Sequence, residues 1–191
     1  MTALDDMAAA AGPSPAILIA RPLVQKYESC RLAPYLDPRG IPTIGWGATT
    51  IDGAPVTMQT SVITQEQADA ALDTTLTAVA SRIAALVHVP LTAHQAAALI
   101  SLAYNIGTGA LAGSTLLKRL NAGDIGEAGY QFMSWVYAGG RVLEGLVARR
   151  SEERRVFLTP DAAPPFVPPD GDSADALNAQ ELASITQGAT T

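Results

Sequence analysis

Residues 33–50 read APYLDPRGIPTIGWGATT, and their composition differs from that of the chain after them. Glycine, proline, threonine and aromatic residues oppose a helix and favour turns and short strands. Residues 37–40, Asp-Pro-Arg-Gly, place aspartate first, proline second and glycine fourth, which is the chemistry of a type I turn. The stretch therefore predicts a small antiparallel hairpin sheet.

The chain after residue 64 is predicted to be helical, because its apolar residues recur at spacings of three or four. Threonine followed three residues later by glutamine, at residues 64–67 and 92–95, is the pattern of a capping box. These boxes begin a long helix over residues 65–89 and a central helix that ends near Gly107. Shorter helices are expected over residues 21–29, 115–121, 125–137 and 145–158.

Three parts are expected along the chain. An N-terminal extension covers residues 1–20, a folded domain covers residues 21–159, and an acidic, proline-rich, flexible tail covers residues 160–191. The tail contains no basic residue and one aromatic residue, so it can bury too little apolar surface to fold by itself. The domain is predicted to be α+β, with a small antiparallel sheet lobe and a mainly helical lobe joined by the long helix.

The composition excludes several kinds of site. The net charge of -6 belongs to the two ends of the chain, since residues 21–155 hold all 12 basic residues and 11 of the 18 acidic ones. No stretch is basic enough to suggest nucleic-acid binding. The single Cys30 cannot form an intrachain disulfide, and His88 and His94 lack the spacing of a metal pair. We expect no metal and no cofactor.

The hydropathy pattern also limits the cellular setting. No apolar run approaches the roughly 20 residues of a membrane span. A signal peptide would begin with basic residues, but no lysine or arginine precedes residue 21. We therefore expect a soluble protein without a signal peptide, a transmembrane anchor or stable membrane insertion. We also expect it to be a monomer.

Two carboxyl groups near the predicted hairpin are candidates for acid/base chemistry. Glu28 lies in the last turn of the helix expected over residues 21–29, where the negative end of the helix dipole helps it to retain its proton. Asp37 follows nine residues later in an open turn, where it should stay ionised. Two carboxyl groups in such unlike environments form an acid/base pair, although two ordinary surface acids could share this spacing.

A larger pattern surrounds this pair. Glu28 is followed after eight residues by Asp37 and after five more by Thr43. In this pattern the chain resembles phage-type lysozymes, glycoside hydrolase family 24, over roughly residues 21–158. Further segments that resemble this family are AYNIG at 103–107, STLL at 114–117, LNAGD at 120–124, residues 132–135, GG at 139–140, and GLVARR at 145–150 with Glu153.

The resemblance implies a lysozyme-like fold and hydrolysis of the β-1,4 bond between N-acetylmuramic acid and N-acetylglucosamine in peptidoglycan. Glu28 would protonate the leaving oxygen, while Asp37 would activate the attacking water and stabilise positive charge on the sugar ring. Thr43 would hold that water through its hydroxyl. The family usually inverts the anomeric configuration, but the separation of the carboxyl groups, which decides the outcome, is not visible in a sequence.

Other residues are candidates for substrate binding. Gly45 and Gly47 lack side chains that would block a sugar, or else they form a β-bulge. Trp46 either stacks on a sugar or belongs to the core. By resemblance, Tyr104 and Asn105 line the helical side of the cleft, and packing at the end of their helix is the alternative.

The last predicted helix carries a run of charges. Most such runs form a solvated face with pairs at helical spacing, such as Arg149 with Glu153. In the family, however, an arginine of the closing helix approaches the catalytic glutamate, and Arg149 or Arg150 would be that residue. The charges alternate as Arg149, Arg150, Glu152, Glu153, Arg154 and Arg155.

The resemblance indicates a phage endolysin that accumulates in the host cytoplasm until a holin lets it reach the wall. A virion-associated or otherwise exported muramidase would have the same domain. A lytic transglycosylase, which uses one carboxyl group and leaves an anhydro-sugar, is an alternative within enzymes. A catalytically silent glycan-binding module is the alternative outside them, although binding does not require the matched Glu28, Asp37 and Thr43.

Overall fold

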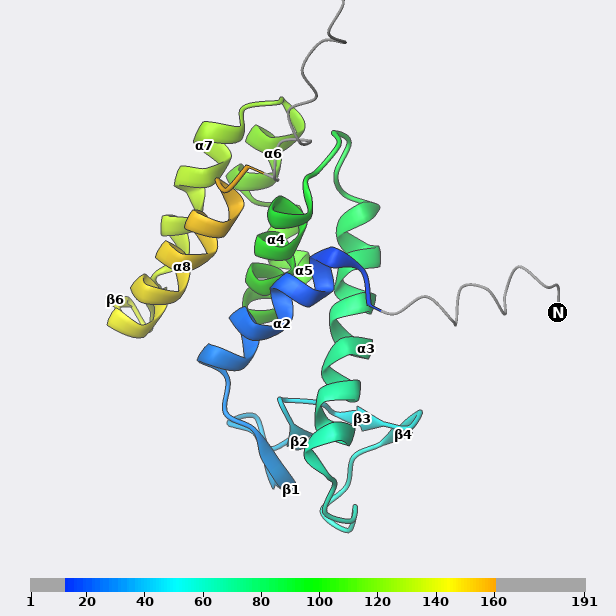
Figure 1. The fold of residues 1–191 in the computed structure, drawn as a ribbon. Coiled ribbons are helices and arrows are strands. Elements are labelled where there is room, and N and C mark those ends of the chain that lie inside the picture. The colour runs from blue at the N-terminus through cyan, green and yellow to red at the C-terminus, as the bar shows by residue number, and fades with distance from the viewer. Residues whose placement is uncertain (1–12, 161–191) are drawn as a thin grey trace, which may run out of the picture. The chain divides into compact units, whose positions relative to one another are not determined.

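The chain divides into two units, residues 1–161 and 162–191. The computed structural model describes residues 13–160, which all belong to the first unit. The predicted tail therefore lies outside the described residues, apart from Pro160. Within the described part, the first two antiparallel hairpins lie beside one end of helix α3 (Gln65–Ala84), and helices α2 (Pro15–Tyr27), α4 (Ala93–Ile106) and α5 (Thr108–Ala112) pack against α3 (Figure 1). Helix α8 (Glu144–Phe157) packs against α4, away from α3. The predicted α+β class is confirmed.

Helix α2 (Pro15–Tyr27) begins six residues before the predicted first helix. Pro15 lies at the start of the helix, and Pro22, the second residue of the predicted helix, lies inside it. An interior proline removes one backbone donor from the helix. Burial of one apolar face offsets this loss, at about 1.5–3 kcal/mol for each large side chain. The buried residues are Ile17, Ala20, Leu23 and Val24.

The predicted hairpin is confirmed as strands β1 (Arg31–Leu36) and β2 (Pro42–Gly45), which pair antiparallel with Tyr35 opposite Thr43. The backbone N–H of Gly40 donates to the carbonyl oxygen of Asp37 at 2.8 Å, which closes the expected four-residue turn. The hairpin therefore places Asp37 at its tip and returns the chain toward helix α3.

A second hairpin, β3 (Thr50–Ile51) with β4 (Ala54–Pro55), was not predicted. Its turn consists of Asp52 and Gly53, whose φ angles are 50° and 77°. Two consecutive positive φ angles are the requirement of a type I′ turn, and Asp-Gly is a preferred sequence for it. The hairpin could therefore have been predicted from this dipeptide.

Helices α3 (Gln65–Ala84) and α4 (Ala93–Ile106) both begin at the predicted capping boxes. Helix α3 ends five residues before the predicted end. Residues 97–103 of α4 are all buried, as expected for a central helix. Gly107 ends α4 with a φ of 86°, a value that glycine adopts without strain.

The remaining elements differ from the prediction in two places. The helix expected over residues 125–137 ends as an α-helix at Tyr130 and continues as a 3-10 helix. Gly139 and Gly140, both with positive φ, form the turn of a short hairpin rather than a simple break. The elements are α5 (Thr108–Ala112), α6 (Thr115–Asn121), α7 (Ile125–Tyr130), η1 (Gln131–Trp135), β5 (Tyr137–Ala138), β6 (Arg141–Val142) and α8 (Glu144–Phe157).

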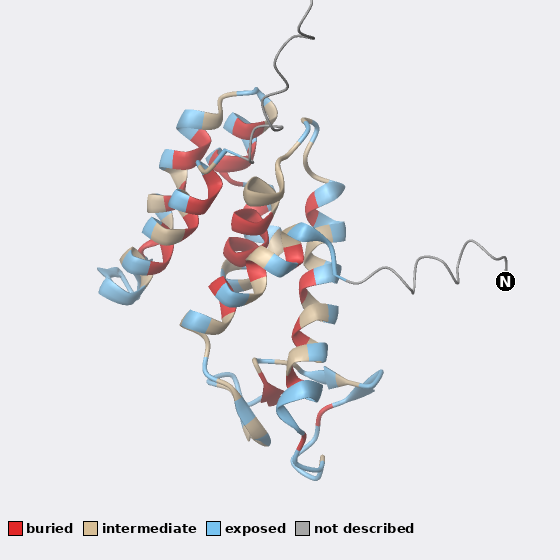
Figure 2. Ribbon diagram, viewed as in Figure 1, coloured by how far each residue is buried: buried red, intermediate tan, exposed pale blue. Residues whose placement is uncertain are grey.

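Two clusters of buried residues support this arrangement, and Figure 2 marks the buried positions in red on the ribbon. The larger cluster surrounds α4 and includes Phe132 and Phe157, whose rings lie 5.3 Å apart. The smaller cluster lies beneath the first hairpin. Trp46 is partly buried and packs against both clusters. Among residues 13–160, no helix has both the length and the hydropathy for a membrane span.

Candidate active site

A groove of about 690 Å³ contains most of the predicted site residues. Four other predicted residues, Thr43, Gly45, Arg149 and Arg150, are not part of its lining. The groove is bounded by the end of α2, the first hairpin, α3 and the end of α4. The predicted residues that line it are Glu28, Asp37, Trp46, Gly47, Tyr104 and Asn105.

Glu28 is held at the C-terminal end of α2 by backbone and side-chain bonds. Its backbone N–H donates to the carbonyl oxygen of Val24 at 3.0 Å. Its carboxylate accepts a hydrogen bond from Nη1 of Arg149 at 2.7 Å, and the Glu28 side chain is 28% exposed. One side of the carboxyl group therefore meets a buried arginine, and Glu28 also lines the groove.

Asp37 is fixed in the ionised form by the turn that follows it. The backbone N–H groups of Arg39 and Ile41 each donate to its Oδ1 at 2.8 Å, and the Arg39 guanidinium donates to Oδ2. These contacts hold the pKa of Asp37 below its usual value, chiefly through the bond from Ile41. These hydrogen bonds therefore explain why Asp37 is ionised, as predicted for the partner of Glu28.

Thr43 lies behind this turn rather than in the groove. It is buried, and its Oγ1 donates to the carbonyl oxygen of Ile41 at 2.9 Å. The same carbonyl accepts the backbone N–H of Asp37, so Thr43 stabilises the loop that carries the carboxylate. Its hydroxyl proton is therefore already used.

The two glycines beside Trp46 have different surroundings. Gly45 is buried, and a Cβ added to it would lie 3.3 Å from the Cβ of Ala68 on α3. It permits close packing of the hairpin on that helix, a role that differs from both predicted roles, sugar contact and a β-bulge. Gly47 is exposed and lines the groove, and a Cβ there would lie 3.3 Å from the hydroxyl of Tyr104.

Replacing Gly47 by alanine should reduce both stability and activity. Its φ of 107° is rarely adopted by other residues, so the change should cost about 1–3 kcal/mol, measurable by urea denaturation. The new methyl group would also crowd Tyr104 and lower kcat/KM on cell walls. The control is Gly123→Ala, at a φ of 80° with nothing within 4 Å, which should lose stability alone. Equal losses of activity in both variants would contradict this role of Gly47.

Trp46 is oriented by the carboxylate of Asp69, a residue that was not identified from the sequence as part of the site. Oδ1 of Asp69, on α3, accepts hydrogen bonds from Trp46 Nε1 at 2.7 Å, Gln25 at 3.0 Å and Gln65 at 3.0 Å. One oxygen thereby joins α2, the hairpin and α3. Trp46 serves as core and groove wall together, so the two interpretations of its role are not exclusive.

Tyr104 and Asn105 line the helical side of the groove, as expected. The Tyr104 hydroxyl donates to the carbonyl oxygen of Trp46, which ties α4 to the hairpin across the groove. Burial, assisted by the nearby charge of Glu28, raises the pKa of Tyr104 to about 12. Tyr104 is therefore neutral at physiological pH, while Asn105 is exposed in the groove.

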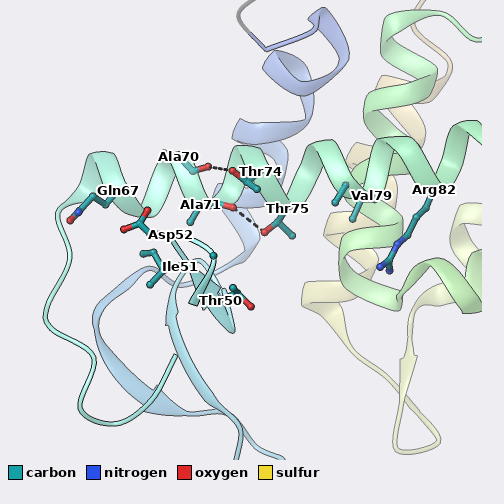
Figure 3. A pocket seen from close by; sticks show the side chains of 12 residues that line it. Thr50, Ile51, Asp52, Gln67, Ala70, Ala71, Thr74, Thr75, Val79 and Arg82 are labelled. Carbon is teal, nitrogen blue, oxygen red and sulfur yellow. Dashed lines mark hydrogen bonds between the residues drawn. The ribbon is translucent and has the colours of Figure 1, made fainter. Parts of the chain in front are cut away.

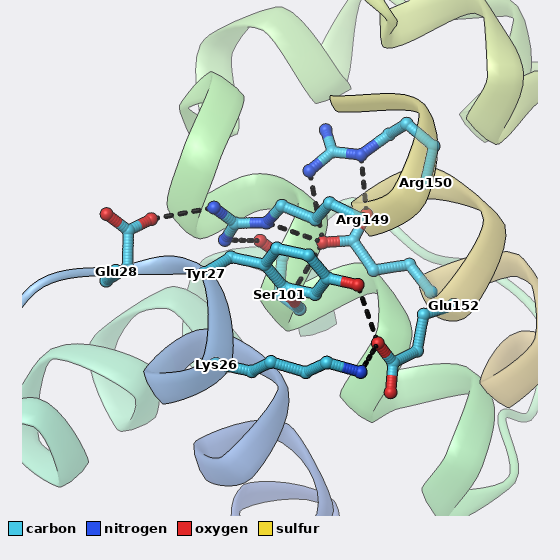
Figure 4. Close-up of polar contacts among 8 residues, drawn as sticks. Lys26, Tyr27, Glu28, Ser101, Arg149, Arg150 and Glu152 are labelled. Carbon is cyan, nitrogen blue, oxygen red and sulfur yellow. Dashed lines mark hydrogen bonds and ion pairs between the residues drawn. The ribbon is translucent and has the colours of Figure 1, made fainter. Parts of the chain in front are cut away.

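Half of the charged run of α8 is buried rather than solvated. Arg149, Arg150 and Glu153 are buried, and Arg149 is the arginine that contacts Glu28, whereas Arg150 pairs with Glu153 (Figure 4). The expectation of a solvated face is therefore wrong for these three residues. Helical spacing correctly indicated the pair of Arg149 with Glu153, at 3.1 Å, but could not show that a neighbouring helix covers it.

A second hollow, of about 530 Å³, adjoins the groove along α3 (Figure 3). It lies between α3 and the β3–β4 hairpin, and it shares Thr75, Val79 and Arg82 with the groove. Sequence reasoning did not single out these residues, because nothing in a helical repeat of small side chains marks a hollow. The two hollows together extend the concave surface well beyond Glu28.

Comparison with known proteins identifies the fold. A family model described as phage lysozyme matches residues 25–153, which is most of the described chain. The chain belongs to the phage lysozyme family. This membership confirms the resemblance seen in the sequence, and it makes the protein a glycoside hydrolase.

Individual phage lysozyme relatives agree with this assignment. The endolysin of Salmonella phage P22 is 42% identical over 137 residues, which cover 71% of this chain and 92% of the relative. The endolysin of Bacillus phage B103 is 38% identical over 142 residues, but the chain spans only 51% of its length. The muramidase domain of SpmX from Asticaccaulis excentricus superposes with a TM-score of 0.64 at 34% identity, covering 78% of this chain and 99% of that domain.

Proposed function

We propose that this chain is an endolysin muramidase, which hydrolyses the β-1,4 bond between N-acetylmuramic acid and N-acetylglucosamine in peptidoglycan. The observation that carries the proposal is that Glu28 and Asp37, held in unlike environments, line the same groove. A groove of about 690 Å³ lies within the usual range of ligand sites. Both carboxyl groups come from one chain, so the enzyme can act as a monomer.

The roles follow from the environment of each group. Glu28 gives its proton to the glycosidic oxygen as the bond from the sugar carbon to that oxygen breaks. Asp37 stays ionised, so it can stabilise the positive charge that develops on the ring and accept a proton from the attacking water. The water oxygen then forms the new bond to the sugar carbon.

The other predicted residues take supporting roles. Trp46, Gly47, Tyr104 and Asn105 present an aromatic face, open backbone and polar groups along the groove to the sugar chain. The Thr43 hydroxyl donates to the Ile41 carbonyl, so it can hold a water only through its remaining lone pairs as an acceptor.

Analysis of the products from purified sacculi by mass spectrometry tests this function. A muramidase adds one molecule of water per bond and leaves a reducing N-acetylmuramic acid end, while a lytic transglycosylase leaves the anhydro form without added water. A silent binding module releases no fragments. Reducing ends are the expected result, and anhydro ends or intact sacculi would reject the proposal.

The biological role that fits this chemistry is lysis of the host cell. An endolysin must reach the wall after it is made in the host cytoplasm, and we propose that a holin provides that access. Retention of the enzyme inside cells until a holin is co-expressed, followed by lysis, is the corresponding observation in a reconstituted host.

A further inference from the structure

Glu153 is a fully buried carboxyl group that the mechanism above does not use. Its side chain is 0% exposed. Oε1 accepts hydrogen bonds from Ser101 Oγ at 2.7 Å, from Arg149 Nε at 3.1 Å and from Arg150 Nη2 at 3.1 Å, and Oε2 lies 2.8 Å from Arg150 Nε. A carboxyl group buried so completely is costly unless these partners compensate it.

Arg149 connects Glu153 to Glu28, which lines the groove, and Figure 4 shows the contact of Arg149 with Glu28. Its Nε donates to Glu153, its Nη1 donates to Glu28 at 2.7 Å, and its Nη2 donates to the carbonyl oxygen of Ser101 at 3.3 Å. A guanidinium is planar and rigid, so fixing Nε also fixes the direction of Nη1. The orientation of Arg149 is thus fixed by Glu153 of α8 and by the Ser101 carbonyl of α4, neither of which lines the groove.

The charges of this cluster balance in only one state. Arg149 and Arg150 contribute two positive charges, since a guanidinium keeps its proton in proteins. Glu153 and an ionised Glu28 would neutralise them. When Glu28 carries the proton that it must transfer, Glu153 alone opposes the two arginines.

We propose that Glu153 is a positioning residue for the acid step: it holds the Arg149 guanidinium against Glu28 and takes up part of its positive charge, so that Glu28 can keep a transferable proton beside a buried arginine. This inference rests on the proposed function of the same groove. It assigns no contact between Glu153 and substrate.

The other ionisable groups around this cluster do not titrate where the acid acts. Tyr27 of α2 and Tyr104 of α4 face it, and burial is the main cause that raises the pKa of each phenol to about 12. Asp37 lies across the groove, and its pKa is below the usual value. Neither these two phenols nor Asp37 would therefore account for opposite shifts of one pH limb in variants of α8.

The ionised state of Glu153 is supported by its contacts. Burial raises the pKa of Glu153, while Arg150, Ser101 and Arg149 act in the opposite direction. Oε1 accepts hydrogen bonds from both arginines, and Oε2 lies 2.8 Å from Arg150 Nε, so two positive charges favour the ionised carboxylate against the effect of burial.

Two substitutions of opposite charge test the proposal through the alkaline limb of the pH profile of kcat on purified sacculi. Glu153→Gln removes the negative charge, so the limb should move to lower pH by about one unit. Arg150→Gln removes a positive charge, and Glu153 then pairs with Arg149 alone. The limb should therefore move to higher pH by a similar amount. Residues needed only for packing would lower activity at every pH without opposite shifts.

The matched control is Glu152→Gln, one residue away on α8. Glu152 bonds instead to Lys26 and Tyr27, both at 2.6 Å, so the limb should stay in place. Limbs that stay fixed or move together in the Glu153 and Arg150 variants would overturn the proposal. If Glu153→Gln does not fold, Arg150→Gln is sufficient as a test. A shift of its alkaline limb to higher pH would support the proposal, and an unshifted limb would overturn it. The proposed function is tested separately, by the identity of the sugar ends that the original protein releases from sacculi.

Discussion

Replacing Glu28 by glutamine should reduce hydrolysis of cell walls by about 10²–10⁴-fold, the usual contribution of a positioned proton donor. Glutamine has nearly the same shape, and its carbonyl oxygen can still accept the bond from Arg149. The protein should therefore remain folded and still sediment with peptidoglycan. Turbidity clearing, circular dichroism and a pull-down on sacculi measure the three properties.

Glu144→Gln is the control for this substitution, because it makes the same chemical change at an exposed position at the start of α8. It should clear walls at the rate of the original protein. Unchanged clearing by the Glu28 variant would eliminate the mechanism, while loss of binding together with clearing would indicate a damaged fold rather than a missing proton.

Replacing Arg149 by methionine should produce the largest loss of stability. The Arg149 side chain is 3% exposed and its partner Glu153 is 0% exposed, so the change leaves a buried carboxylate with one partner fewer. Breaking a buried ion pair in this way costs about 3–5 kcal/mol, which urea denaturation would measure. Activity should fall as well, by about 10²-fold, because Glu28 loses the group that orients it.

Arg155→Met is the matched control on the same helix, since Arg155 is exposed. It should change stability by less than about 0.5 kcal/mol. Arg149→Lys separates charge from geometry, because an ammonium group cannot span Glu28, Glu153 and the Ser101 carbonyl in the plane that a guanidinium provides. Full activity of the lysine variant would show that charge alone is sufficient.

Local sequence chemistry predicted much of the fold because it acts over a few residues. The capping boxes at Thr64 and Thr92 and the turn at Asp37 depend on side chains three or four positions away, and each is present as expected. The predicted start of α2 was wrong because Pro15 and Pro22 both suit a first helical turn. Tertiary burial of the residues between these two prolines decides at which proline the helix begins.

The site was predictable where the motif names the reacting groups, and not where packing gives a residue its role. Glu28 and Asp37 were found from their spacing, and they line one groove. The burial of Glu153 and the bonds of Asp69 depend on contacts 23 to 52 residues away in the chain, which no local pattern contains. Alternating charges on α8 look the same whether water or α4 covers them.

The position of Trp46 between the two core clusters gives the enzyme a natural optical label. The chain has two tryptophans, and the other, Trp135, lies in η1. A Trp135→Phe background would leave a single indole on the wall of the groove, hydrogen-bonded to Asp69. Its fluorescence emission would follow the arrival and departure of glycan in stopped-flow mixing, without any attached dye.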